Sequence, residues 1–257
     1  MRKSHKYLFF SIGLILLIMA VLTVFRLKSR IITVSLPPAV PYSAPENTEL
    51  QVSEKQPEPE PEKKTAKTLP AEVNLKIPFT SQAPHQNWEM PYQHFCEEAS
   101  VLMAVSYVKN QTIAGPDDAD AKMRDIMEFE IKQFGYHEDT NITETATILR
   151  QHFNLSKVAV VDEPTVLQIK TALAEGKAVI VPAAGRQLGN PNFQSPGPLY
   201  HMLVIKGYRK NGDFITNDPG TRKGADYVYR ADTLMNAIHD WNGGNVETGK
   251  KVMIVVG

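Results

Sequence analysis

The order of helix and strand patterns predicts an α+β fold, in which helices pack on an antiparallel sheet. Helical apolar spacings dominate the first half of residues 73–257, and short strand patterns dominate the second half. Runs of helices followed by runs of strands favour this class over a regular alternation of the two. At about 185 residues, this part of the chain suits one domain with a sizeable core.

The expected elements follow in order along the domain. Residues 73–79, VNLKIPF, alternate apolar and polar side chains as a half-buried strand does. A loop with Pro84 and Pro91 follows, and from Cys96 apolar residues recur at intervals of three and four, which predicts a helix. Further helices are expected at residues 117–134, 143–153, 165–175 and 232–240. Strands are expected at residues 158–161, from 178, from 201, from 213, from 226 and in the terminal VMIVVG.

A membrane anchor is expected in residues 1–30. Tyr7 to Phe25 is a run of 19 residues without a charge, long enough to span a bilayer as a helix. The run ends in basic residues rather than in a small-residue cleavage site, so an uncleaved, single-pass anchor is predicted. Three basic residues stand on each side of it. The positive-inside rule therefore does not choose an orientation.

Residues 31–72 are expected to form a disordered stalk. They are rich in Pro, Glu and Lys and contain the low-complexity run PEPEPE. Such a segment cannot bury enough surface to offset the entropy of ordering it. Because Pro-rich charged segments are extended, the stalk would hold the domain at 73–257 away from the membrane.

Charge and cysteine content exclude two classes of protein. The chain has 28 basic and 28 acidic residues, so it lacks the basic footprint of a nucleic-acid-binding protein, and no nucleic-acid partner is predicted. A single cysteine excludes an internal disulfide framework. We predict no cofactor, and the sequence leaves the oligomeric state open.

The only cysteine, Cys96, is a candidate nucleophile. It opens a predicted helix, where unpaired backbone N–H groups and the helix dipole favour a thiolate. Glu97 and Glu98 would oppose a thiolate if they pointed the same way; otherwise they are ordinary acidic residues of a helix N-terminus. The alternative for Cys96 is a buried, unreactive small side chain.

His201 is the candidate base. A thiol nucleophile needs an imidazole to take its proton and usually a third group to orient that imidazole. His201 opens a strong strand and follows residues 185–200, a long loop rich in Gly, Pro and Asn. Loops of this kind are usually functional or disordered. We expect this loop to shape a substrate cleft.

Asp218 is the candidate orienting group. If a four-residue loop joins the strands from 201 and 213, His201 lies opposite Asp218, and Lys206 lies opposite Asp213 as a favourable cross-strand pair. A two-residue Asn-Gly turn would instead pair His201 with Arg222. The alternative for Asp218, in the segment NDPG, is ordinary turn chemistry.

Acyl transfer also needs donors at the developing oxyanion. The side-chain amide of Gln82, in the loop before the Cys96 helix, is one candidate. The backbone N–H of Cys96 is the second donor. Gln93 is a weaker alternative, because it is too close in sequence to reach back across the thiol.

These segments, in this order, resemble the papain-like cysteine peptidases, and among them the bacteriocin-leader-processing (double-glycine) peptidases and their stand-alone relatives. The segments are IPFTSQ, FCEEASVLMAVSYV, HMLVIKGY and NDPG. The resemblance implies a papain-like fold in which the nucleophile helix packs on an antiparallel sheet. It implies Cys96 as nucleophile, His201 as general base and then acid, Asp218 as orienting carboxylate and Gln82 as oxyanion donor. The family commonly has Gly-Pro-Ala or Gly-Ala-Ala after the cysteine, whereas this chain has Glu-Glu-Ala.

The expected function is that of a membrane-anchored cysteine peptidase, which hydrolyses peptide (amide) bonds of a peptide or protein substrate through a thioester acyl-enzyme. Trp88, Tyr92 and Tyr200 are candidate substrate-binding residues. Stand-alone relatives are often exported, so the C-terminal domain is expected outside the cytoplasm.

Three alternatives remain open. The same triad serves transamidases, in which an amine resolves the thioester. A binding module could keep the fold without activity, with Phe193 beside the three aromatic residues in a ligand cleft. A metal site could use His137, Glu138, Asp139 and His152, but their spacing matches no recognised ligand pattern. No metal is predicted.

Overall fold

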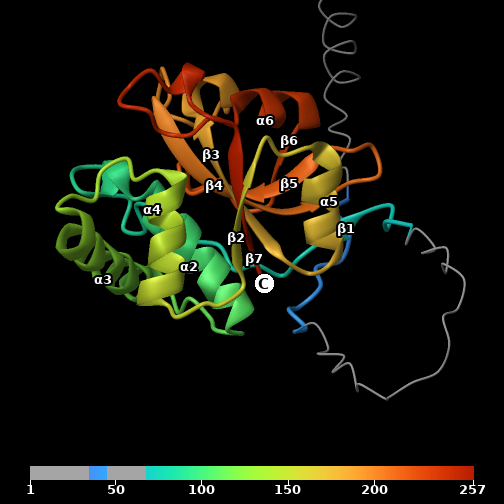
Figure 1. Ribbon diagram of the computed structural model, residues 1–257, viewed down its shortest axis with the longest axis horizontal. Coiled ribbons are helices and arrows are strands. Elements are labelled where there is room, and N and C mark those ends of the chain that lie inside the picture. The colour runs from blue at the N-terminus through green and yellow to red at the C-terminus, as the bar shows by residue number, and fades with distance from the viewer. Residues whose placement is uncertain (1–34, 45–67) are drawn as a thin grey trace, which may run out of the picture. The chain divides into compact units, whose positions relative to one another are not determined.

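The computed structural model describes residues 35–44 and 68–257, and within them a seven-stranded antiparallel sheet forms the centre of the domain (Figure 1). The strands are β1 (Val73–Asn74), β2 (Val158–Asp162), β3 (Ala178–Ala184), β4 (Tyr200–Tyr208), β5 (Phe214–Asn217), β6 (Tyr227–Tyr229) and β7 (Val252–Val256). Their order is β2-β7-β3-β4-β5-β6, and β1 pairs with the end of β4. The predicted α+β class with an antiparallel sheet is confirmed.

Helices cover the central strands on both faces. The α-helices are α2 (Cys96–Val108), α3 (Pro116–Phe134), α4 (Ile142–Thr147), α5 (Val166–Ala174) and α6 (Ala231–Ala237). The short helices are η1 (Tyr92–His94), η2 (Ile148–His152), η3 (Gly185–Leu188) and η4 (Val246–Thr248). Figure 1 shows α2, α3 and α4 on one side of the sheet and α5 on the other. Every residue of β3 and β4 is therefore buried.

The helix that carries the candidate nucleophile is an interior helix. Twelve of the thirteen residues of α2 are buried, and α2 packs against β3, β4 and α3. A helix that is apolar all round belongs in a core. The exceptions are Glu97 and Glu98, which lie in its first turn and are completely buried. The first residue of α2 is Cys96.

Several predicted elements have different bounds in the structure. The strand expected at 73–79 is reduced to β1, after which Leu75 makes one more bond to β4, and Pro78 has no N–H to continue the ladder. The helix expected at 143–153 is α in its first part and becomes a π-helix from Ile148. The helix expected at 232–240 ends at Ala237.

The register predicted for the β4–β5 hairpin is wrong. The structure pairs Val204 with Asn217 and Gly207 with Ile215, with a bulge between Ile205 and Gly207. The bulge and a five-residue loop, 209–213, shift the pairing, because each bulged residue displaces the ladder by one position. Lys206 consequently does not face Asp213.

Lys206 forms an ion pair with Asp226 instead. Asp226 precedes β6, which pairs with β5. The ion pair thus links the bulge in β4 to the residue before β6, two strands away in the sheet.

Part of the predicted stalk belongs to the domain. Val40 forms a bridge with Leu75, and the Tyr42 ring meets the Tyr107 ring of α2 edge-on at 5.2 Å. Residues 37–44 of the predicted stalk thus pack on the domain, and residues 45–67 of it lie outside the described residues. The predicted anchor at 1–30 lies outside the described residues. Within the described part of the chain, no helix has both the length and the apolar character needed to cross a bilayer.

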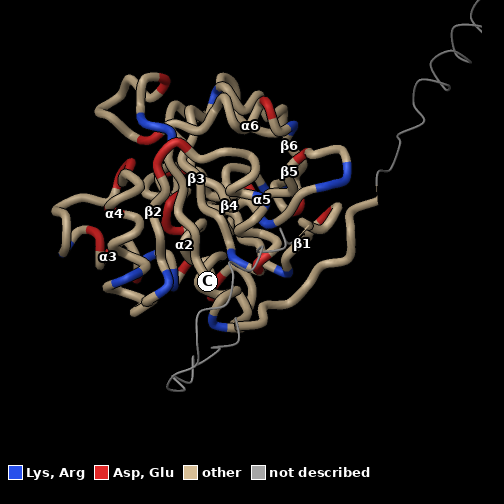
Figure 2. The backbone as a smooth tube through the Cα atoms, turned by 45° about the vertical axis from the view of Figure 1, so that its right-hand side comes forward, with Lys and Arg blue, Asp and Glu red and all other residues tan. Residues whose placement is uncertain are grey.

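Charged residues of both signs are interspersed along the domain (Figure 2). On α3, Arg124 pairs with Asp120 and Lys122 pairs with Asp118, and each pair is four residues apart. Such surface pairs contribute little each, but they keep the exposed face of α3 soluble.

Candidate active site

A buried imidazole–carboxylate pair lies where β4 begins and β5 ends. The Nε2 atom of His201 is 2.7 Å from Oδ1 of Asp218, and the two side chains are 1% and 0% exposed. The two residues meet without being cross-strand partners, because Asp218 follows the last residue of β5 and begins a tight loop. That loop is closed by the N–H of Asp218, which donates to the carbonyl of Gly224.

The Asp218 carboxylate accepts four hydrogen bonds. Oδ1 accepts from His201 and from the backbone N–H of Gly220 at 3.0 Å. Oδ2 accepts from the Tyr229 hydroxyl at 2.5 Å and from Asn190 Nδ2 at 3.1 Å. Burial acts to raise the pKa of Asp218, but the contacts with His201, Tyr229 and Gly220 outweigh it and lower the pKa. Asp218 is therefore held as a carboxylate.

Asn190 and Tyr229 were not predicted as site residues. Tyr229 lies on β6 and Asn190 in the loop before β4, and the Asn190 amide also donates to the Tyr229 hydroxyl at 2.9 Å. Burial and the charge of Asp218 raise the pKa of Tyr229, so its hydroxyl remains a donor. The sequence offered one signal for Asn190, its place in the long loop that precedes His201.

One aromatic ring and one glycine fix the position of the His201 ring. Phe193 meets it edge-on, with ring centroids 5.3 Å apart. A Cβ atom added at Gly220 would lie 2.8 Å from His201 Cε1 and 2.9 Å from Phe193 Cε1. Only glycine fits at this position, because a methyl group there would displace one of the two rings.

Cys96 lies at the start of α2, and its thiol is directed toward a carboxyl group. Sγ donates to Oε2 of Glu97 at 3.0 Å, and Cys96 is 4% exposed. Burial raises the pKa of the Cys96 thiol well above its ordinary value, and Glu97, Glu98 and Asp139 raise it further. In this arrangement the thiol is protonated and makes no hydrogen bond with His201.

A cluster of buried carboxyl groups lies beside the thiol. Glu97, Glu98 and Glu130 are each completely buried, and burial raises the pKa of all three, that of Glu130 to about 11. Glu130, on α3, accepts from the Thr140 hydroxyl at 3.2 Å. Nδ1 of His137 lies 3.6 Å from Oε1 of Glu98. The raised pKa values favour the protonated, uncharged form of each carboxyl group.

Gln82 connects the loops around the site. Its Nε2 atom donates to the carbonyls of Tyr92 and Gln93 at 2.9 and 3.1 Å, and its backbone N–H donates to Pro219 at 3.0 Å. Both amide hydrogens therefore hold the segment before Cys96 in place. Gln93 contributes to this contact through its carbonyl and not through its side chain.

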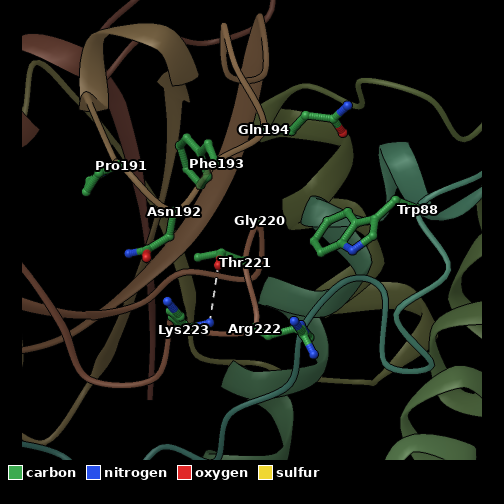
Figure 3. Close-up of a pocket in the computed structure, with 9 residues that line it drawn as sticks. All are labelled: Trp88, Pro191, Asn192, Phe193, Gln194, Gly220, Thr221, Arg222 and Lys223. Atoms are coloured by element: carbon green, nitrogen blue, oxygen red, sulfur yellow. Dashed lines mark hydrogen bonds between the residues drawn. The ribbon is translucent and has the colours of Figure 1, made fainter.

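A cavity of about 730 Å³ lies next to His201 (Figure 3). Trp88, from the loop before Cys96, faces Phe193 across it, and the loop after Asp218 contributes Thr221 and its neighbours.

Of the three predicted substrate-binding residues, only Trp88 lines this cavity. Tyr92 is buried against Phe95, and its hydroxyl accepts from Arg124 at 2.6 Å. Tyr200 is buried, and its hydroxyl donates to the carbonyl of Thr140 at 3.2 Å. Side chains alternate along a strand, so Tyr200 points away from the face that His201 occupies.

The residues weighed as metal ligands are not gathered into one site. His152 contacts Asp125 at 2.9 Å, whereas His137 contacts Glu98 and Glu138. Across residues 35–44 and 68–257, no group of three or more His, Cys, Asp or Glu side chains is arranged to hold a metal ion.

Comparisons with known proteins identify the family of the chain. The model of the Peptidase C39-like family matches residues 74–245, more than half of the chain, and the chain belongs to that family. A search of curated proteins finds no match. The resemblance to papain-like cysteine peptidases, and to stand-alone relatives of the leader-processing enzymes, is thus confirmed, and the family supports cysteine peptidase activity.

Solved structures with a similar chain path include a candidate C39-like peptidase from Bacillus anthracis, with 16% identity and a TM-score of 0.48, over 72% of this chain and 98% of that one. A prointerpain A fragment from Prevotella intermedia has 15% identity and a TM-score of 0.48, over 72% of each chain. Active interpain A from the same organism has 22% identity and a TM-score of 0.28, over 44% of each chain.

Proposed function

We propose that this protein is a cysteine peptidase, which hydrolyses peptide bonds through a thioester acyl-enzyme. The observation that carries the proposal is the buried pair of His201 and Asp218, of which His201 lies on β4, the strand against which the Cys96 helix packs. The chain's only cysteine is the first residue of that helix. Membership of the Peptidase C39-like family supports the same chemistry.

The hydrogen bond to Asp218 assigns a role to each nitrogen of His201. Because Asp218 engages Nε2, Nδ1 is the atom left to accept the thiol proton. The Cys96 sulfur then attacks the carbonyl carbon, and His201 passes the proton to the leaving amine. Water hydrolyses the thioester, with His201 as base, and returns the thiol.

The reaction requires the Cys96 thiol to leave Glu97 and to face His201. At the start of α2, the N–H of Ala99 donates to the carbonyl of Phe95. The N–H of Cys96 lies before this bond and has no acceptor within the helix. That N–H is the oxyanion donor we propose. Gln82 supplies a second donor only if it gives up one of its bonds to Tyr92 and Gln93.

We also propose that the enzyme is anchored in a membrane, with its domain outside the cytoplasm. The uncharged run from Tyr7 to Phe25 supports the anchor. A peptide or protein substrate would reach the domain from the aqueous side. Protease protection of intact cells and of inside-out vesicles would test the orientation.

One observation favours a second candidate function, a peptidase-fold binding module. The Cys96 thiol donates a hydrogen bond to Glu97, and the pKa of the thiol is raised, whereas the pKa of an activated nucleophile is lowered.

A transamidase would use the same residues as the peptidase, with an amine in place of the water. Product analysis with and without an added amine separates hydrolysis from transamidation.

The pH dependence of iodoacetamide labelling tests the peptidase proposal. Full-length protein in mild detergent is compared with His201→Ala, and the labelled residue is identified by mass spectrometry. Labelling well below the ordinary pKa of a thiol, lost in His201→Ala, is the expected result. Slow labelling with the same profile in both proteins would favour the binding module.

A further inference from the structure

The cavity beside His201 has a charge of one sign. Its two charged lining residues are Arg222 and Lys223, and no Asp or Glu lines it. Both lie in the loop that Asp218 begins and Gly224 closes, and both are exposed. Figure 3 shows them at the cavity wall, with Trp88 on one side and Phe193 on the other.

Neither cation is neutralised within the described part of the chain. Arg222 Nη1 donates to the side-chain oxygen of Gln86 at 2.7 Å, an uncharged acceptor. No carboxylate among residues 35–44 and 68–257 lies within 4 Å of either charged group. The nearest acids in sequence are engaged elsewhere: the oxygens of Asp218 are occupied by four donors, and Asp226 forms an ion pair with Lys206.

The cavity reaches the ring that the proposed chemistry uses. Gly220 and Phe193 line it, and both lie against His201. A peptide bound in the cavity would therefore lie beside His201.

We propose that this cavity binds a carboxylate of the peptide substrate, close to the bond that is cleaved. Arg222 and Lys223 would bind the carboxylate, and the ring of Trp88 would cover the apolar part of the peptide beside it. The proposal rests on the proposed peptidase function. A carboxylate is chosen because two uncompensated cations attract an anion, and an arginine fork matches its two oxygens.

Binding to a variant that cannot turn over tests this proposal. Full-length Cys96→Ala protein is titrated against fluorescein-labelled, alanine-based hexapeptides, and binding is followed by fluorescence anisotropy. The first peptide has one central glutamate and blocked ends. The second has glutamine in its place, and the third has glutamine and a free carboxyl terminus.

The chain offers a matched control for the two cations. Arg222→Gln with Lys223→Gln removes the cavity charges, and Arg209→Gln with Lys210→Gln removes an identical dipeptide from the β4–β5 loop. Circular dichroism verifies that both double variants fold.

We expect a peptide with a carboxylate to bind about tenfold more tightly than the blocked glutamine peptide, because a charge-assisted hydrogen bond is lost without it. This preference for a carboxylate should disappear when Arg222 and Lys223 are replaced and persist when Arg209 and Lys210 are replaced. Tighter binding of the first peptide identifies a side-chain carboxylate, and that of the third identifies a terminal one. Equal binding of all three peptides, or a preference that survives loss of Arg222 and Lys223, overturns the proposal.

These outcomes are separate from failure of the proposed function. Binding is measured without Cys96, so it does not depend on a reactive thiol. Slow alkylation of Cys96 that does not depend on His201 would overturn the proposed peptidase function. A preference for carboxylate peptides in the same protein would still show that the cavity binds a carboxylate.

Discussion

The Cys96 thiol donates a hydrogen bond to Oε2 of Glu97, the residue that follows it, at 3.0 Å. The dipole of α2 favours a thiolate at this position, whereas burial and the adjacent carboxyl groups oppose it. The opposing effects are larger, since the pKa of Cys96 is raised. Glu97 thus keeps the proposed nucleophile in its resting form.

Replacing Glu97 with Gln should make the thiol more acidic. The variant keeps the size of the side chain, removes the carboxyl group that raises the pKa of Cys96, and provides an amide N–H for the thiolate. We expect the midpoint of iodoacetamide labelling to move to lower pH; each unit increases the thiolate fraction near neutral pH about tenfold. The control is Glu128→Gln, an exposed acid on α3. Slower labelling of Glu97→Gln would mean that Glu97 assists proton removal.

Tyr229→Phe should weaken both the fold and the orientation of His201. It removes one of the two donors to Oδ2 of the buried Asp218 carboxylate, and a hydrogen bond to a charged group contributes about 1.5–3 kcal/mol. Denaturant unfolding measures this loss, and the rate of Cys96 labelling measures the effect on the site. Tyr227→Phe is the control, because the Tyr227 hydroxyl makes no hydrogen bond within the described residues. An unchanged free energy of unfolding would show that Asn190 and Gly220 suffice for Asp218.

The sequence predicts most of the helices and strands, because the periodicity of apolar residues that marks each one lies within its own segment. The apolar run of α2 and the strand at 201 need only periodicity, and both occur near the expected positions. The hairpin register does not depend on periodicity alone. A bulge at Lys206 shifts it, and the partner that makes this favourable, Asp226, lies on a different loop.

The site was predictable in its residue types but not in its contacts. The sequence indicates His201 by its place at the start of a strand and Asp218 by the predicted hairpin register, and the two meet although that register is wrong. Gln82 was expected to point at the substrate, but its amide holds backbone carbonyls before Cys96. Hydrogen bonds between distant segments depend on tertiary packing, which no local pattern contains.

Glu130→Gln should reduce the loss of stability at high pH. The pKa of Glu130 is about 11 in the folded protein and about 4.3 in an unfolded chain, so the unfolded state releases the proton first as pH rises. The stabilisation from this proton is therefore fully present below about pH 4.3 and is lost progressively as pH rises toward the folded-state pKa, by up to about 1.4 kcal/mol per pH unit. Gln mimics the protonated acid and removes this dependence.

Thermal unfolding at pH values of about 6 and about 9 measures the effect. We expect Glu130→Gln to be relatively more stable at the higher pH, whereas Glu128→Gln, on the same helix but exposed, should follow the parent protein. Parallel pH profiles for parent and Glu130→Gln would indicate that Glu130 is ionised in the folded state.

Gly220→Ala should impair the site while leaving the domain folded. The added Cβ would lie 2.8 Å from His201 Cε1 and 2.9 Å from the Phe193 ring, closer than carbon atoms approach without repulsion. Phe193 is partly exposed at the cavity, so one of the two rings can move without disturbing the core. If His201 moves, its bond to Asp218 lengthens, and histidine-dependent labelling of Cys96 falls toward the rate of His201→Ala.

The two possible movements give different results. Displacement of Phe193 alone would leave Cys96 labelling at the parent rate but would reduce peptide binding in the Cys96→Ala background, because Phe193 forms part of the cavity wall. Loss of the folded state, seen as a collapse of the circular dichroism signal, would show that the ring positions at this loop are required for folding itself. Parent-like labelling together with parent-like binding would contradict the tight contact between Gly220 and His201.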